Sequence, residues 1–183
     1  MKILVAGFKP YSSYSTNPAE EILPMIHEDD VSTVLLDVSY SRSQKQMLKA
    51  LAESEADAVV VVALSPFIKS PAIERYAYNS MDSVEPDMDG VVKSGEEIVK
   101  GGSSNLFPPV DVTTIDAYVL SQGNTSQLSI EPGKYVANAV YYRALSAGMP
   151  TIMVHVPFAE TFPLSESRDT IVNVIEYLRG CQF

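Results

Sequence analysis

The chain has 183 residues, of which 46 % are hydrophobic and 20 % charged, and this composition is that of a folded globular protein rather than a disordered one. Its formal net charge of −10 repels phosphate backbones and no basic cluster offsets it, so a nucleic acid is not an expected partner. No apolar stretch reaches the roughly 18 residues that cross a bilayer, so we expect no membrane-bound form. The length suits one hydrophobic core, and we expect residues 1–183 to form a single domain.

The only cysteine is Cys181, two residues from the end of the chain. A disulfide within the chain is therefore impossible, which is typical of a reducing compartment. The first residues, MKILVAGF, enter a strand-like run directly and are too short for the core of a signal peptide. Together these features predict a cytoplasmic protein.

Four short apolar runs are predicted to be strands of one sheet. They are rich in β-branched residues and apolar on both faces, as buried strands of a mostly parallel sheet are. The runs cover residues 3–6, 33–38, 59–64 and 152–156.

Helical patterns separate these runs. Asn17 before Pro18 is a helix start, and Glu20 is placed to complete a capping box. Strands that alternate with helices predict a three-layer α/β/α sandwich with an open, mostly parallel twisted sheet. In such sheets, ligands bind at the carboxyl ends of the strands. The other predicted helices cover residues 43–54, 114–120 and 132–147 and a C-terminal stripe of Ile171, Val174, Ile175 and Leu178.

Details of three helices can also be predicted. The helix over residues 43–54 is expected to bury Met47, Leu48 and Leu51 on one side. Gly123 is expected to end the helix before it, and Pro132 to occupy the first turn of the next one. The long segment from residue 82 to 109 lacks periodicity and is expected to be a loop or hairpin over one end of the sheet.

Two ionisable residues could carry chemistry. His155 lies near the end of an apolar run, where a base could face a ligand, although a core histidine with satisfied nitrogens is the plainer interpretation. Glu74 lies in the segment AIERYAYN, which is apolar enough to be partly buried. A buried carboxylate needs a partner, which could be a histidine that it orients or simply Arg75.

Two further segments attract attention. Residues 85–96 match the spacing of a calcium loop, but Pro86 stiffens it and its flanks do not form paired helices, so we interpret it as a solvated acidic loop. Phe8, Pro10 and Tyr11 follow the first strand, and aromatic residues there either wall an apolar pocket or only pack.

The segments GFKPYSSYSTNPAEEIL, AIERYAYN, PGKYVANAVYY and MVHVPF together resemble the pyroglutamyl-peptidase I (pyrrolidone-carboxylate peptidase) family. They are similar to its Gly-Phe-x-Pro-Phe start, its Glu-Arg-x-Ala-x-Asn segment, its Ala-Gly-x-Tyr-x-Cys-Asn helix start and its His-Val-Pro-Tyr strand end. The four segments occur in the family's order and cover nearly the whole chain.

The resemblance implies a phosphorylase/hydrolase-like α/β/α domain. It also implies a cytosolic cysteine peptidase, which removes N-terminal pyroglutamate from peptides without a metal or cofactor. It also implies a homo-oligomer and a pyroglutamyl peptide or small lactam-like ligand. Glu74 matches the acid and His155 the base of the family's Cys-His-Glu triad. The triad's cysteine falls on Ala137. The aromatic segment with Phe8, Pro10 and Tyr11 matches the one that encloses the lactam ring.

The chain departs from the family at more than this position. A methyl group cannot attack a carbonyl, so the covalent route is closed at Ala137. Val84 stands where the family has an arginine associated with stabilising charge, and a carboxylate at Glu85 would oppose a developing oxyanion if it pointed inward. Ser12 and Ser13 stand where the family has glycines, and Met88 stands where it has an asparagine. Phe67 and Ile68 replace small and basic residues of the family.

Several explanations stay open. The alanine could have been engineered into a true peptidase to trap a complex, but an engineer would change one residue rather than this set, so we favour natural divergence. Glu74 and His155 could instead activate water in a different hydrolase. A non-catalytic binding or partner subunit is a further alternative.

Overall fold

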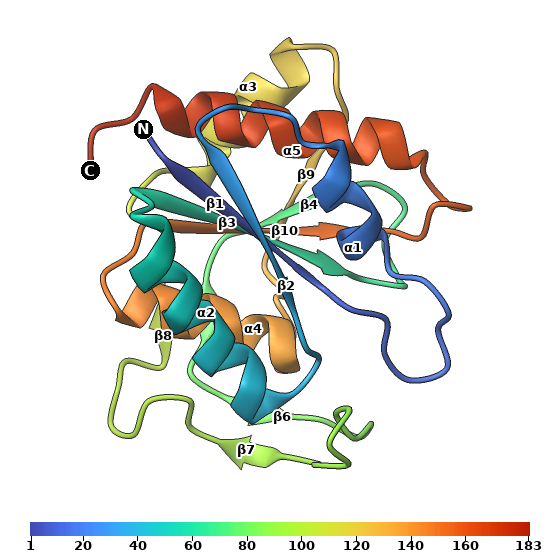
Figure 1. The fold of residues 1–183 in the computed structure, drawn as a ribbon, viewed down its shortest axis with the longest axis vertical. Helices are drawn as coiled ribbons and strands as arrows, with labels where there is room; N and C mark the ends of the chain where they lie inside the picture. Colours follow the sequence, from blue (N-terminus) through green and yellow to red (C-terminus); the bar gives the residue numbers. More distant parts are fainter.

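Six strands form the twisted central sheet of this protein, whose computed structural model describes residues 1–183 (Figure 1). The strand order is β2-β1-β3-β10-β4-β9, and only the β10–β4 pair is antiparallel. This confirms the predicted open, mostly parallel sheet. The strands are β1 (Ile3–Phe8), β2 (Val31–Leu36), β3 (Ala58–Leu64), β4 (Ala72–Glu74), β9 (Gln127–Ser129) and β10 (Thr151–Val156).

Helices cover both faces of the sheet and complete the three layers (Figure 1). One face carries α1 (Pro18–Ile22), α3 (Val112–Ser121) and α5 (Leu164–Arg179), and a short 3-10 turn, Leu23–Met25, follows α1. The other face carries α2 (Tyr40–Ser54) and α4 (Val136–Ser146). No helix is both long and apolar enough to cross a bilayer.

Side chains of the strands alternate between two hydrophobic cores, as period-2 geometry requires. Ile3 and Val5 of β1 belong to the core under α1, α3 and α5, whereas Leu4, Ala6 and Phe8 belong to the core under α2 and α4. Both cores bury the central strands completely. This is why these runs are apolar throughout rather than alternating.

The connection from β1 to α1 is tightly fixed. A Cβ on Gly7 would lie 2.5 Å from the carbonyl oxygen of Ala19, so only glycine allows α1 to approach the end of β1 this closely. Asn17 caps α1 by accepting a hydrogen bond of 3.0 Å from the Ala19 N–H, and its amide donates to the Lys9 carbonyl. The predicted helix start at Asn17 and Pro18 is confirmed.

Several element boundaries differ from the prediction. β2 covers Val31–Leu36 rather than residues 33–38, and α2 begins at Tyr40, where the Ser39 hydroxyl accepts from the Arg42 N–H. Leu48 is 42 % exposed, which corrects its predicted burial. The longer helix fixes the buried stripe through Tyr40, Ser43 and Met47, and Leu48 is turned about 100° away from Met47.

The largest correction concerns α4, which begins at Val136 and not near Pro132. Gly133 has a φ of 69°, a left-handed conformation that cannot belong to a right-handed helix. Tyr135 is the N-cap residue. Ala137 is therefore the second residue of the helix, nearer to its open end than the sequence suggests.

The segment between residues 77 and 106 forms two small antiparallel pairs beyond α2 and α4 (Figure 1). They are β5 (Ala77–Tyr78) with β8 (Asn105–Leu106), and β6 (Met81–Asp82) with β7 (Ser94–Glu96). Asp87 organises the loop by accepting hydrogen bonds from the N–H groups of Tyr40, Asp89 and Val91. The calcium-like spacing thus serves backbone bonding, and no three acidic, histidine or cysteine side chains are grouped to hold a metal.

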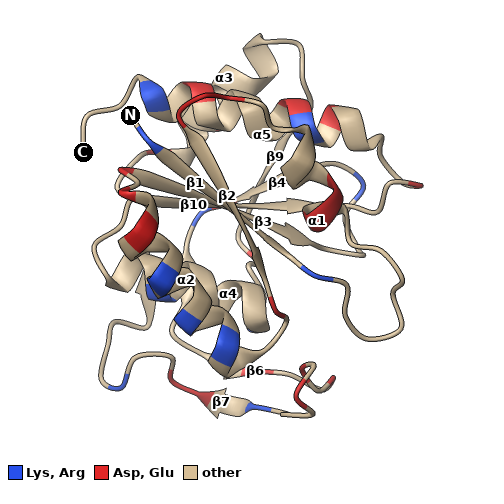
Figure 2. Ribbon diagram, in the orientation of Figure 1, with Lys and Arg blue, Asp and Glu red and all other residues tan.

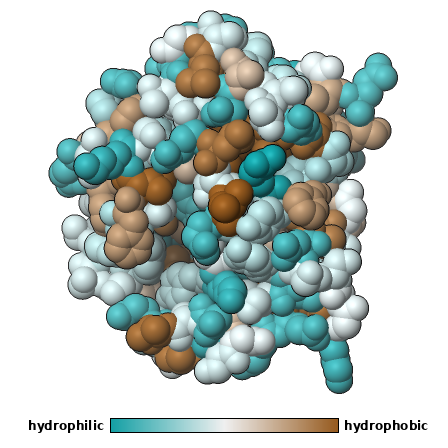
Figure 3. Space-filling model, turned by 180° about the vertical axis from the view of Figure 1, so that it is seen from behind, coloured by the Kyte–Doolittle hydropathy of each residue, from teal (hydrophilic) through white to brown (hydrophobic).

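Charge is unevenly distributed over this face. The charged residues of α2 are mostly basic and those of the segment that contains β6 and β7 are mostly acidic, although each also carries a residue of the opposite sign (Figure 2). One pair joins the two elements, since Arg42 lies 2.9 Å from Asp89. On the back of the molecule, hydrophobic side chains lie in several separate groups between hydrophilic ones (Figure 3).

Candidate active site

A histidine of β10 and a glutamate of β4 form a pair between two neighbouring interior strands of the sheet. His155 Nδ1 lies 2.7 Å from Glu74 Oε1. In the antiparallel β10–β4 pair His155 is opposite Ala72, so Glu74, two residues on, projects from the same face. That face also carries α4.

Both partners are shielded from water. Glu74 is 1 % exposed and His155 8 % exposed. Because Nδ1 contacts Glu74, the other ring nitrogen, Nε2, is the one left for a ligand. Arg75, the plainer partner for Glu74, is exposed and forms no ion pair with it. The pair therefore has the geometry of a base oriented by an acid.

Glu74 and His155 line a cavity of about 890 Å³. Phe8 ends β1, Leu64 ends β3 and His155 precedes the last residue of β10, so the cavity opens at the carboxyl ends of three parallel strands. This is the position expected for a ligand site in an open sheet. Of the three aromatic-segment residues, Phe8 and Tyr11 line the cavity and Pro10 does not.

Ala137 also lines the cavity, at the N-terminus of α4. Tyr135 makes no side-chain capping bond, so N–H groups of the first turn remain open to a ligand. The neighbouring Asn138 has a purely structural set of contacts. Its amide accepts from the Tyr78 N–H and donates to the carbonyls of Tyr78 and Ser80, which ties α4 to β5.

A row of tyrosine rings in mutual contact lies along the cavity, and the sequence predicted only Tyr11 among them. Tyr11 contacts Tyr14 and Tyr135, with ring centroids 5.4 and 5.8 Å apart, and Tyr135 contacts Tyr40 at 5.6 Å. Burial raises the pKa of Tyr11 to about 12 and, together with nearby charges, raises that of Tyr135. These rings therefore stay neutral in ordinary buffers. No spacing pattern marks Tyr14 and Tyr135, because they come from segments far apart in the chain.

Most of the residues that depart from the family pattern line the same cavity, whereas Ser13 and Met88 do not. Val84 and Phe67 line it while being 94 % and 92 % exposed, and Glu85 is an exposed lining residue. Ser12, at a family glycine position, lines it with a φ of 54°. A serine in this left-handed region is strained where glycine would not be.

A paired base and acid beside the open end of a helix, at the carboxyl edge of a parallel sheet, is the arrangement of hydrolases that use a side-chain nucleophile. A family model described as pyroglutamyl peptidase matches residues 1–159, and the chain belongs to this family.

Individual relatives agree with this assignment. The chain is 30 % identical over 169 residues to the pyrrolidone-carboxylate peptidase of Pyrococcus furiosus, which covers 86 % of this chain and 81 % of that protein. It is 31 % identical over 148 residues to that of Halalkalibacterium halodurans, covering 78 % of this chain and 73 % of the other.

Solved structures with the same fold include the pyrrolidone carboxyl peptidase of Thermus thermophilus, with a TM-score of 0.89 at 25 % identity. That match covers 95 % of this chain and 98 % of the other. The structures of the Pyrococcus furiosus peptidase and its Cys-free mutant match with a TM-score of 0.88 at 25 % identity, covering 97 % of both chains.

Proposed function

We propose that this chain is a member of the pyroglutamyl peptidase family that keeps the ligand cavity but does not cleave by a covalent route. The observation that carries the proposal is Ala137, which lines the cavity with His155 at the second position of α4. The family resemblance puts the nucleophilic cysteine there, and a methyl group has no lone pair with which to attack a carbonyl.

The only thiol of the chain does not replace it. Cys181 follows α5, its Sγ lies 3.6 Å from the Tyr177 carbonyl, and it is not among the residues that line the cavity. Burial also raises its pKa, which disfavours the reactive thiolate. In this proposal, Glu74 and His155 orient and hydrogen-bond a bound ligand, with Phe8 and Tyr11 enclosing its apolar part.

The proposal is tested with a pyroglutamyl arylamide and three proteins: the unmodified chain, Ala137→Cys, and Ala137→Cys combined with His155→Ala. We expect no turnover by the unmodified chain. A cysteine at this helix start beside His155 should form a thiolate readily, so Ala137→Cys should gain measurable kcat/KM. The double variant, which lacks the base, should lose that gain.

The gain should also be limited. Loss of electrostatic donors for an oxyanion costs about 10²–10³ in rate, and Val84 and Glu85 replace such a segment. Turnover of the arylamide by the homogeneous unmodified chain, lost on His155→Ala, would contradict the proposal.

A second candidate is a working peptidase in which alanine replaced the cysteine by design. The intact 2.7 Å contact between Glu74 and His155 favours it, because a base and its orienting acid are already in place in the cavity that Ala137 lines. It predicts that the natural gene encodes cysteine at position 137 and that Ala137→Cys alone gives full activity. An alanine codon in the natural gene excludes it.

A further inference from the structure

We infer that the cavity is built for an organic cation: a ligand with an apolar or aromatic body and an ammonium or guanidinium group at the mouth. The inference rests on the proposed function, because it takes the cavity to be a retained binding site. It assigns to that site a charge preference that a neutral lactam does not require.

The mouth carries carboxylates that lack counter-ions. Asp82, Glu85 and Glu131 line the cavity, and all three are exposed. None forms an ion pair with a lysine or arginine of the chain. They come from β6, the β6–β7 loop and the segment before α4, so the tertiary structure brings them to one opening. Their combined field attracts positive charge.

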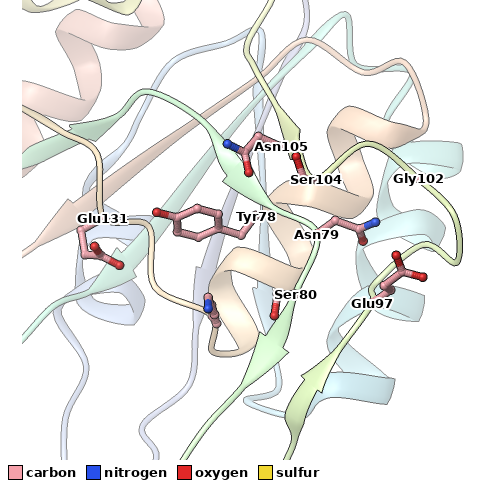
Figure 4. A pocket seen from close by; sticks show the side chains of 9 residues that line it. Tyr78, Asn79, Ser80, Glu97, Gly102, Ser104, Asn105 and Glu131 are labelled. Carbon is pink, nitrogen blue, oxygen red and sulfur yellow. The ribbon is translucent and has the colours of Figure 1, made fainter.

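The only lysine that lines the cavity is directed elsewhere. Lys134 Nζ lies 5.7 Å from the centre of the Tyr78 ring. Tyr78 lines a separate, polar cavity of about 550 Å³ and is not part of the wall of the larger one. In Figure 4 the Tyr78 ring extends from its strand toward Glu131 in that second cavity. Lys134 also lines that second cavity together with Glu131, but it forms no ion pair with Asp82, Glu85 or Glu131.

The walls suit the body of such a ligand. Tyr11, Tyr14 and Phe67 line the cavity along with Tyr135, and aromatic faces attract cations as well as apolar groups. Glu85 lies close enough to Tyr135 to contribute to the raised pKa of that ring. A carboxylate beside aromatic rings is the combination that recognises ammonium groups.

A buried acceptor at the inner end of the cavity points to a ligand that also carries an N–H donor. Glu74 lines the cavity, is 1 % exposed and uses Oε1 for His155, whereas its Oε2 has no hydrogen-bond partner. An unpaired buried carboxylate oxygen is costly, and a ligand that donates an N–H would satisfy it. This observation is independent of the acids at the mouth, because Glu74 is buried whereas those acids are exposed.

Titration calorimetry with three probes of similar size tests the inference: benzylammonium, benzyl alcohol and phenylacetate. We expect the cation to bind roughly tenfold more tightly than the alcohol, as the cation–π and carboxylate contributions suggest. Phenylacetate should bind more weakly than the alcohol. The preference for the cation should shrink as salt is added, because exposed carboxylates are screened.

Variants identify the groups responsible. The triple variant Asp82→Asn/Glu85→Gln/Glu131→Gln should remove most of the tenfold preference and leave benzyl alcohol binding unchanged. Asp29→Asn/Glu53→Gln/Glu160→Gln removes three exposed carboxylates that line neither cavity, and as the matched control it should change nothing. The two variants remove surface charges only, so folding is preserved in both.

The outcomes separate this inference from the proposed function. Equal affinity for the cation and the alcohol, or a preference that survives the triple variant, would overturn the inference. Absence of binding by all three probes would overturn it as well. None of these results bears on whether the unmodified chain cleaves a pyroglutamyl arylamide, which alone decides the proposed function.

Discussion

The inner end of the cavity and its mouth differ in how the fold holds them. Glu74, His155 and Phe8 stand on strands of the central sheet, are buried, and are set by strand register. Val84, Glu85 and Phe67 stand on loops and are exposed. The inner end matches the family pattern and the mouth departs from it. Buried polar groups must keep their partners, whereas exposed loop residues can change at little cost in stability.

Ala137 is the exception that makes the comparison informative. It lies at a helix start against the inner end, yet its side chain differs from the family's. A nucleophile is needed only for the reaction, while the pair beside it also satisfies buried polar atoms. Under the proposed function, the thiol is absent while Glu74 and His155 keep the contact that satisfies their buried atoms.

The largest effect that tests this comparison is expected for Glu74→Ala. The change leaves the buried Nδ1 of His155 without a partner and should lower the free energy of unfolding by about 2–3 kcal/mol. Urea denaturation measures it. Glu85→Ala, at the mouth, should stay within about 0.5 kcal/mol of the unmodified chain. Similar losses for both variants would break the comparison.

Gly7→Ala is expected to have the next largest effect. The added Cβ would lie 2.5 Å from a backbone oxygen of α1, so the end of β1 or the helix must move. Overpacking of this kind costs about 1–3 kcal/mol. The matched control is Ser13→Ala, in the same connection but exposed, which should be neutral in the same denaturation experiment. A neutral Gly7→Ala would show that α1 adjusts freely.

A smaller effect of opposite sign is expected at the mouth. Ser12→Gly relieves a φ of 54° and should raise the free energy of unfolding by about 0.5–1 kcal/mol, after the entropy that glycine gains in the unfolded chain is subtracted. Ser13→Gly, whose φ is not positive, should give no increase. Thermal unfolding of the two variants side by side distinguishes strain relief from a general effect of glycine.

The smallest predicted effect concerns Tyr11, and it changes the stability of the protein only at alkaline pH. Its pKa is raised by burial from 10.0 to about 12, so between these values the unfolded chain ionises while the folded one does not. Stability should therefore fall as the pH rises through this window. Tyr11→Phe should flatten that fall without changing stability at neutral pH. If the stability of Tyr11→Phe fell equally steeply with pH, the Tyr11 hydroxyl would be exposed to water and not buried.

The agreement between sequence and structure is best where one periodicity governs a whole element. The buried strands and the stripe of Ile171, Val174 and Ile175 follow their patterns. The start of α4 did not, because Gly133 takes a left-handed conformation that propensity and a nearby proline do not reveal. The predicted burial of Leu48 was wrong because α2 starts at Tyr40, and its buried face therefore runs through Tyr40, Ser43 and Met47.

The candidate site divides in the same way. The family resemblance marked Glu74, His155 and Ala137 in the sequence, and all three line one cavity. Spacing could not choose between Arg75 and His155 as the partner of Glu74. Glu74 and His155 are 81 positions apart, and the chain between them holds no local signal of the antiparallel pairing that joins them. Tyr14 and Tyr135 were missed for the same reason.

By itself the sequence determined the layered α/β architecture, through apolar runs and helical stripes, and the absence of a thiol at position 137. The tertiary structure alone decided that Glu74 faces His155, that Lys134 turns toward Tyr78, and that three unpaired carboxylates share one opening. Local patterns depend on bonds between near neighbours in the chain. Charge compensation and pairing depend on which distant segments meet, which is set only when the helices pack on the two faces of the open sheet.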